Sequence, residues 1–296
     1  TDVPHKRSLS RGCFHPDSLS WQIMSLEKIE YCPVCGGQTF TAFLTCLDYT
    51  TTGESFHVEQ CVQCQMLATN PRPSEPNAAH YYQSKNYISH TSASYNLIDR
   101  IYLLVRRFTL KWKYSLVKKY LKNNSLLDLG AGTGHFVDLC ISKKVNCYGI
   151  EPSNSKKDHP RIYNSTEQIP VKQFDVITLW HVLEHIYKLD DTLTTLRNLL
   201  TDSGTIFIAV PNWQSYDATF YKNHWAAYDV PRHLWHFSQK NMTTLLTKQG
   251  FKLLEIVPMK LDAYYVSQLS EKYKNNGTLT LKHMARAFWI SVVSNF

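Results

Sequence analysis

Apolar side chains recur along the chain in two patterns. Short, nearly uninterrupted apolar runs predict buried strands, and longer segments with apolar residues every three or four positions predict amphipathic helices. The expected strands are 39–45, 55–60, 125–129, 146–150, 161–164, 174–180, 205–212 and 251–257. The expected helices are 94–121, 135–143, 191–200, 238–249, 260–274 and one from about 280, and a turn is expected at 202–204. From residue 125 the order begins with a β-α-β unit.

The first 23 residues stand apart from this pattern. They begin at Thr1, show neither period, and lack the apolar core of a secretion signal. Patterned sequence starts at Met24. We therefore expect residues 1–23 to be a disordered or non-native tail, with a native disordered arm as the alternative. Because there is no secretion signal, the expected location is the reducing cytoplasm.

Four of the eight cysteines form two C-x-x-C pairs, Cys32/Cys35 and Cys61/Cys64. The two-residue gap lets both thiolates of a pair face one ion, and two pairs supply four soft ligands in a tetrahedron, which suits Zn²⁺. We therefore predict a structural zinc ribbon over residues 24–75. Disulfides are the alternative, which a reducing compartment disfavours. The remaining cysteines are expected to be free thiols; they are Cys13, Cys46, Cys140 and Cys147.

Three prolines at 71, 73 and 76 break regular structure and mark the end of the ribbon. An aromatic linker and a helix with one basic face are expected over residues 76–124. The formal charge of +8 permits contact with nucleic acid or anionic lipid, but a basic helix face is more often simply solvated. With 43% hydrophobic and 19% charged residues the chain is globular, and no apolar run is long enough to cross a membrane.

The strand at 125–129 runs directly into a glycine-rich turn at 130–134, and Glu151 follows the next strand. The two carboxylate oxygens of Glu151 can hold a ribose diol, and the glycines let the backbone approach a ligand closely. The glycines alternate as G-x-G-x-G, with His135 where a dinucleotide motif has its last glycine, and Asp128 precedes the turn. This pattern fits a ligand that carries cationic groups and lacks a pyrophosphate.

Residues 127–134, LDLGAGTG, resemble the first motif of the class I S-adenosylmethionine-dependent methyltransferases. Residues 181–186, HVLEHI, resemble the family's fourth motif, and the order of elements agrees over about 125–258. The resemblance implies an α/β, Rossmann-like sheet with helices on both faces over residues 125–296. It also implies S-adenosylmethionine as cofactor, bound by Asp128, Gly130, Ala131, Gly132, Gly134, Glu151, Ser165, Trp180 and His181.

The sequence departs from that family in two places. Only residues 152–160 separate the second strand from the third, so the helix there must be very short, and Ser165 and Thr166 are the nearest candidates for the adenine wall. The family also ends with an antiparallel seventh strand, which has no convincing counterpart before Phe296. We expect either that the natural protein extends beyond Phe296 and supplies this strand, or that the sheet is one strand short.

Two narrower resemblances concern the substrate. The paired cysteines, proline-rich linker and Tyr-Tyr stretch resemble bacterial methyltransferases of polysaccharide and sugar-modification pathways. Glu184-His185 is similar to quinone-biosynthesis O-methyltransferases, in which a Glu-x-x-Glu-His set can hold a divalent ion. Because His181 replaces the first Glu, we favour an interpretation in which His181 and Glu184 line the cofactor and cap the helix; a metal at His181, Glu184 and His185 is the alternative.

The loop after the fifth strand is rich in polar and aromatic residues, and loops of this kind lie beyond the carboxyl ends of the strands. We predict His233 as the general base, with Asp229 orienting its ring and Arg232 anchoring an acidic group of the substrate. His236 and then His224 are the second and third candidates. The alternative is an aromatic packing loop whose histidines are merely hydrogen-bonded.

The function favoured by these features is methyl transfer to a small molecule, a sugar nucleotide or glycan intermediate. One alternative is an RNA methyltransferase that uses the zinc ribbon to recognise RNA, which the basic helix and the +8 charge permit. A quinone-type O-methyltransferase is another. A non-catalytic binding protein is disfavoured by the intact glycine turn and Glu151.

Overall fold

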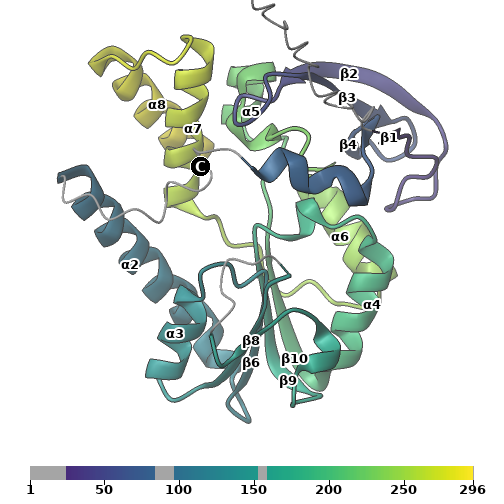
Figure 1. Ribbon diagram of the computed structural model, residues 1–296, viewed down its shortest axis with the longest axis vertical. Helices are drawn as coiled ribbons and strands as arrows, with labels where there is room; N and C mark the ends of the chain where they lie inside the picture. The colour runs from purple at the N-terminus through teal and green to yellow at the C-terminus, as the bar shows by residue number, and fades with distance from the viewer. Residues whose placement is uncertain (1–24, 84–96, 153–158, 296) are drawn as a thin grey trace, which may run out of the picture.

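The structure is a computed structural model that describes residues 25–83, 97–152 and 159–295 (Figure 1). The predicted tail at 1–23, which includes Cys13, lies outside the described residues. So does most of the segment 152–160, between the second and third predicted strands. The helices are α2 (Leu97–Val117), α3 (His135–Ser142), α4 (Leu189–Leu199), α5 (Tyr216–Tyr221), α6 (Gln239–Lys248), α7 (Lys260–Lys274) and α8 (Leu281–Ser294).

A five-stranded parallel sheet forms the centre of the molecule, in the order β10-β9-β6-β7-β8. Its strands are β6 (Ser125–Leu129), β7 (Asn146–Ile150), β8 (Ile162–Tyr163), β9 (Phe174–Trp180) and β10 (Leu200–Ala209). Helices α2 and α3 cover one face, and α4 and α6 cover the other (Figure 1). β6 and β9 are buried almost throughout, which is why their sequences are continuous apolar runs. The predicted Rossmann-like fold is confirmed.

The predicted turn at 202–204 is wrong. β10 begins at Leu200, and its pairing with β9 shifts register between Leu200 and Thr205. Asp202 and Ser203 lie within this shift. The extra residues of β10 bulge out between two paired positions, and the strand continues without a turn.

The predicted strand at 251–257 is also wrong, since this segment has no ladder partner among the described residues. A groove of about 1110 Å³ lies between it and β10, and it reaches Trp180 and His181. The apolar side chains that predicted a strand stay exposed, with Leu253, Leu254 and Ile256 at 45%, 60% and 51%. An apolar run becomes a strand only where a neighbouring strand can pair with it.

The N-terminal module contains β1 (Leu26–Glu27), β2 (Phe40–Leu47), β3 (Ser55–Cys61), β4 (Leu67–Thr69) and β5 (Arg72–Pro73). A second sheet has the order β11-β4-β3-β2, and its strand β11 (Trp235–His236) comes from the loop after β10. One apolar core includes Ile29, Met66, Leu183 and Leu234. The module and the part that contains the parallel sheet are therefore joined by a strand pair and a shared core.

Helices α7 and α8 pack on each other and on α5, near the N-terminal module (Figure 1). Both predicted helices are present, and α8 begins with a capping box between Thr280 and His283. None of the helices in the described ranges is long and apolar enough to cross a lipid bilayer.

Candidate active site and zinc site

The glycine turn connects β6 to α3 and packs against the segment that follows β9. The amide groups of Gly130 and Ala131 both donate to the carbonyl of Ile150, at 2.8 and 2.9 Å. Gly130 has φ +72°, and a Cβ there would lie 2.3 Å from Val182 Cγ2. Only glycine fits this position, both for its backbone and for the close approach of Val182.

Glu151 directly follows β7 and lies beside the glycine turn. Its Oε2 accepts a hydrogen bond of 2.8 Å from the amide of Gly132. Ser165, the candidate for the adenine wall, precedes a short 3-10 turn after β8 and is half-buried. Because the strands are parallel, the ends of β6, β7, β8 and β9 meet at one edge of the sheet, so the predicted cofactor residues share that edge.

Asp128 lies inside β6 and is only 3% exposed. Its Oδ1 accepts a hydrogen bond of 2.6 Å from Thr178 Oγ1 on β9. Burial raises the pKa of Asp128 to about 7, against the lowering effects of Thr178 and Lys113. The protonated and ionised forms of Asp128 are therefore both populated near neutral pH, and a cation bound next to the carboxyl group would favour the ionised form.

Trp180 and His181 end β9. The Trp180 ring packs edge-to-face on Phe136, lies 4.6 Å from the Lys113 ammonium, and keeps a buried indole N–H without a partner among the described residues. His181 has φ +59°, an unfavourable conformation for a residue with a Cβ, and such conformations concentrate at functional sites.

The His181 ring bridges two carboxylates, Asp262 from α7 at 2.8 Å and Glu184 at 3.4 Å. Packing around the ring lowers its pKa, but the hydrogen bonds and charges of Asp262 and Glu184 outweigh this and raise the pKa of His181 to about 9. The ring is therefore protonated at neutral pH. Sequence reasoning missed Asp262 and Lys113, because nothing in their local sequence marks them as neighbours of β9.

Glu184, His185 and His233 form a compact cluster. One ligand-type atom of each lies within 4.8 Å of the other two, and the His185 and His233 rings are 4.7 Å apart. The cluster is assembled by the backbone, because the Leu234 amide donates to the Glu184 carbonyl at 2.8 Å. Sequence reasoning had singled out each residue but had not placed His233 beside Glu184-His185, since the two segments are far apart along the chain.

Arg232 has a role different from the predicted one. Its side chain is 1% exposed, and all five N–H groups donate, to Asp48, Thr51, the Tyr81 carbonyl and, twice, Asp229. The guanidinium has no donor left for a substrate's acidic group. Arg232 instead ties the loop after β10 to the N-terminal module.

Asp229 is likewise committed to Arg232, with 2.6 and 3.0 Å between their paired atoms. It lies 4.0 Å from His233 Nε2, too far for a hydrogen bond. The group that orients His233 is the Ala227 carbonyl, 2.8 Å from Nδ1. In the neutral ring the lone pair is therefore on Nε2, which lies 4.0 Å from a carboxylate oxygen of both Glu184 and Asp229.

The other two candidate bases are not in the cluster. His236 belongs to β11, is 3% exposed, and its Nε2 lies 3.1 Å from Thr69 Oγ1. Burial and the nearby His233 lower the pKa of His236 to about 3. His224 ends the 3-10 turn Lys222–His224 and lies near the ring of Tyr49.

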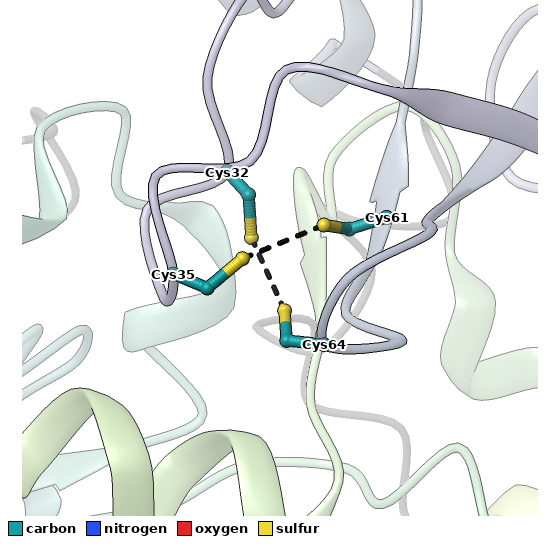
Figure 2. Close-up of side chains that lie close together, drawn as sticks. All are labelled: Cys32, Cys35, Cys61 and Cys64. Carbon is teal, nitrogen blue, oxygen red and sulfur yellow. Dashed lines mark hydrogen bonds between the residues drawn. The ribbon is translucent and has the colours of Figure 1, made fainter.

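The four paired cysteines converge, as Figure 2 shows. Cys32 Sγ lies 3.4 Å from Cys64 Sγ, and Cys35 Sγ lies 3.6 Å from Cys61 Sγ. In a tetrahedral site with zinc–sulfur bonds of about 2.3 Å, sulfur atoms are about 3.8 Å apart. Gly36 and Gln65 both have positive φ, 75° and 63°, so the turn after each pair has the same form. The donor set and its spacing fit a zinc ion.

Comparison with known proteins decides the family. A family model described as "Methyltransferase domain" matches residues 101–256, more than half of the sequence. The chain belongs to this methyltransferase family. The class I fold and an S-adenosylmethionine-dependent methyltransferase activity, both expected from the motifs, are thereby confirmed. A search of curated proteins found no match.

Solved structures show a distant likeness to this methyltransferase. A Burkholderia thailandensis 1,6-didemethyltoxoflavin N1-methyltransferase is 14% identical with a TM-score of 0.44, covering 66% of this chain and 88% of its own. A possible histamine N-methyltransferase from Thermotoga maritima is 20% identical with a TM-score of 0.41, covering 52% and 76%. Likenesses at this level carry no argument about the acceptor.

Proposed function

We propose that the methyltransferase acts on a hydroxyl group of a small molecule at the Glu184/His185/His233 cluster, and that this molecule is a sugar nucleotide or glycan intermediate. The observation that carries the proposal is the position of the cluster. It directly follows β9, next to Val182, which packs on the glycine turn. An acceptor bound there would lie beside the cofactor residues.

S-adenosylmethionine, when bound, supplies a methyl group on a positively charged sulfur. The chain's residues have three tasks around it. Glu151 and the glycine turn hold the nucleoside part, Asp128 favours a cationic ligand, and His181 closes the site toward α7. In the neutral ring of His233 the proton is on Nδ1, which donates to the Ala227 carbonyl, so Nε2 is the atom that accepts the proton of the acceptor hydroxyl.

The structural zinc ion belongs to the same proposal. Held by Cys32, Cys35, Cys61 and Cys64, it would fix the two turns of the N-terminal module. This module then supports the site loop through β4–β11 pairing and through Arg232. A site with four protein ligands has no open position, so the ion takes no part in methyl transfer.

Two observations favour a small acceptor over RNA. One edge of the ribbon sheet is occupied by β11. Basic residues of α2 are engaged within the protein, with Arg106 3.0 Å from His135 and Lys113 over Trp180. The predicted basic face is therefore not an uninterrupted track for a phosphate backbone.

The test is a methyl-transfer screen with labelled S-adenosylmethionine against sugar nucleotides, quinol precursors and RNA. We expect turnover with sugar nucleotides only. On the acceptor found, His233→Asn should lose about 10²–10⁴-fold in turnover with unchanged cofactor affinity, whereas His236→Asn and His224→Asn should not. Turnover on RNA alone, or a fully active His233→Asn, would contradict the proposal.

A further inference from the structure

Glu184 poses an energetic problem within the cluster. Its side chain is completely buried, and its Oε2 atom has no hydrogen-bond partner among the described residues. An ionised carboxylate in this state is costly unless a positive charge compensates it. His181 approaches Oε1 at 3.4 Å, but its shorter contact, 2.8 Å, is with Asp262, and Oε2 has no such neighbour.

The two histidines of the cluster are held in matching ways. The Nδ1 atom of His233 lies 2.8 Å from the Ala227 carbonyl, and the Nδ1 atom of His185 lies 3.0 Å from the Arg232 carbonyl. A carbonyl accepts only, so each Nδ1 carries the proton. In the neutral form of each ring, Nε2 then carries the lone pair that can bind a metal ion.

This is how metal-binding histidines are held in proteins, since a backbone carbonyl or carboxylate on the far nitrogen fixes both tautomer and ring orientation. The Tyr82 hydroxyl, 3.0 Å from His185 Nδ1, adds a second polar contact on the same side.

We infer that Glu184, His185 and His233 bind a divalent transition-metal ion through one carboxylate and two imidazole nitrogens. The donor set of two nitrogens and one oxygen favours ions such as Zn²⁺, Co²⁺, Fe²⁺ or Mn²⁺ over Mg²⁺ and Ca²⁺. The present separations, within 4.8 Å, need a modest inward movement of the side chains to reach bonds of about 2.0–2.2 Å. Three protein ligands leave positions open.

The catalytic role of this metal ion rests on the proposed function, because it requires an acceptor hydroxyl at the cluster. The acceptor would then present an oxygen atom to an open position of the ion, and the ion's charge would lower the pKa of that hydroxyl. His233 would then act as a ligand in place of its role as the base, and the proton of the metal-bound hydroxyl would pass to bulk water, so His233→Asn lowers turnover in either case. Metal binding itself is measurable without any acceptor.

The experiment is a Co²⁺ titration of protein whose ribbon is loaded with zinc and whose weaker sites have been stripped by a mild chelator. We expect one further Co²⁺ per chain, with a visible spectrum that lacks the sulfur-to-metal bands of a cysteine site. Glu184→Gln and His233→Asn should each weaken Co²⁺ binding by at least about tenfold, since loss of an outer-shell partner alone costs 10–100-fold.

The matched control is His224→Asn, a histidine of the same loop outside the cluster, which should bind Co²⁺ as the wild type does. If Glu184→Gln does not fold, His233→Asn carries the comparison, with zinc content and melting temperature as the check of folding. The inference is overturned if wild type takes up no Co²⁺ beyond the ribbon, or if both variants bind it as tightly as wild type. S-adenosylmethionine affinity, measured on the same samples, separates this result from a failure of the proposed function.

Discussion

Arg232 and Asp48 form a buried ion pair, with 2.9 Å between Nη2 and Oδ1, although one belongs to the loop after β10 and the other to the N-terminal module. The two side chains are 1% and 0% exposed. Asp48 also accepts hydrogen bonds from the amides of Thr50, Thr51 and Thr52, so its charge orders a whole turn. The pair joins the two parts of the chain at the residue next to His233.

Arg232→Met should therefore be strongly destabilising. It leaves the buried Asp48 and the half-buried Asp229 without their cation, and breaking a buried pair in this way costs about 3–5 kcal/mol. Urea unfolding would measure the loss. The matched control is Lys248→Met, which removes the exposed Lys248–Asp190 pair and should cost at most about 1 kcal/mol. Equal effects of the two substitutions would show that the Arg232 network contributes little.

The N-terminal module that holds the four paired cysteines shares its apolar core and a strand pair with the rest of the protein. Cys61→Ser should lower zinc content well below one equivalent, and thermal unfolding should begin at a lower temperature. Because β4 pairs with β11, the damage should extend to the His233 loop and reduce turnover more than cofactor affinity.

Cys46→Ser is the control for zinc content. Cys46 is a buried cysteine of β2 outside the cluster, so this variant should keep its zinc whatever it loses in stability. Full zinc content in Cys61→Ser would count against the assigned ligands.

The sequence was most informative about the parallel sheet. β6, β7 and β9 lie at the predicted residues, because strands that helices cover on both faces have nearly continuous apolar sequences. The same rule failed at 251–257, where the apolar run is present but no strand in the described part of the chain pairs with it. The apolar pattern of a segment shows which of its faces can be buried. It does not show whether another strand lies next to the segment and can pair with it.

The site was predictable residue by residue but not as an arrangement. Glu184, His185 and His233 were each marked by their chemistry, yet their meeting depends on a backbone bond between Leu234 and Glu184. The sequence shows the charge of Arg232, which favours a role in holding a substrate, but it does not show the partners of Arg232 in the N-terminal module. Long-range contacts of this kind are what one sequence leaves open.

Glu151 should contribute to cofactor affinity in two separable ways. Glu151→Ala loses both the contacts to the ribose and the hydrogen bond from the Gly132 amide, and should weaken S-adenosylmethionine binding by about 1.5–3 kcal/mol. Glu151→Gln keeps an acceptor for Gly132 and should lose less. Calorimetry of both variants measures the difference, with Glu30→Gln, an exposed acid of the N-terminal module, as control. Unchanged affinity in Glu151→Ala would remove Glu151 from the site.

Asp128 should lower the free energy of unfolding at neutral pH while it increases the affinity for S-adenosylmethionine. Burial raises its pKa to about 7, from 3.8 for a free side chain. Between these two pH values the unfolded chain has released the proton while the folded protein keeps it, so wild-type stability falls as pH rises from about 4 to 7 and does not recover above it. Asp128→Asn removes this dependence and can still accept the Thr178 hydroxyl. We therefore expect the variant to match wild type near pH 4 and to exceed it at pH 7.5 by up to about 4 kcal/mol in free energy of unfolding.

Cofactor binding should change in the opposite direction, because a neutral amide no longer attracts the cationic groups of S-adenosylmethionine. Unfolding at pH 4, 5.5 and 7.5, together with calorimetry at pH 7.5, measures both quantities, and Asp202→Asn on the exposed part of β10 is the control for a lost surface charge. A stability difference that stays constant across the three pH values would mean that Asp128 is already ionised in the folded protein at low pH. Cofactor affinity equal to wild type would mean that the acid acts only within the core of the sheet.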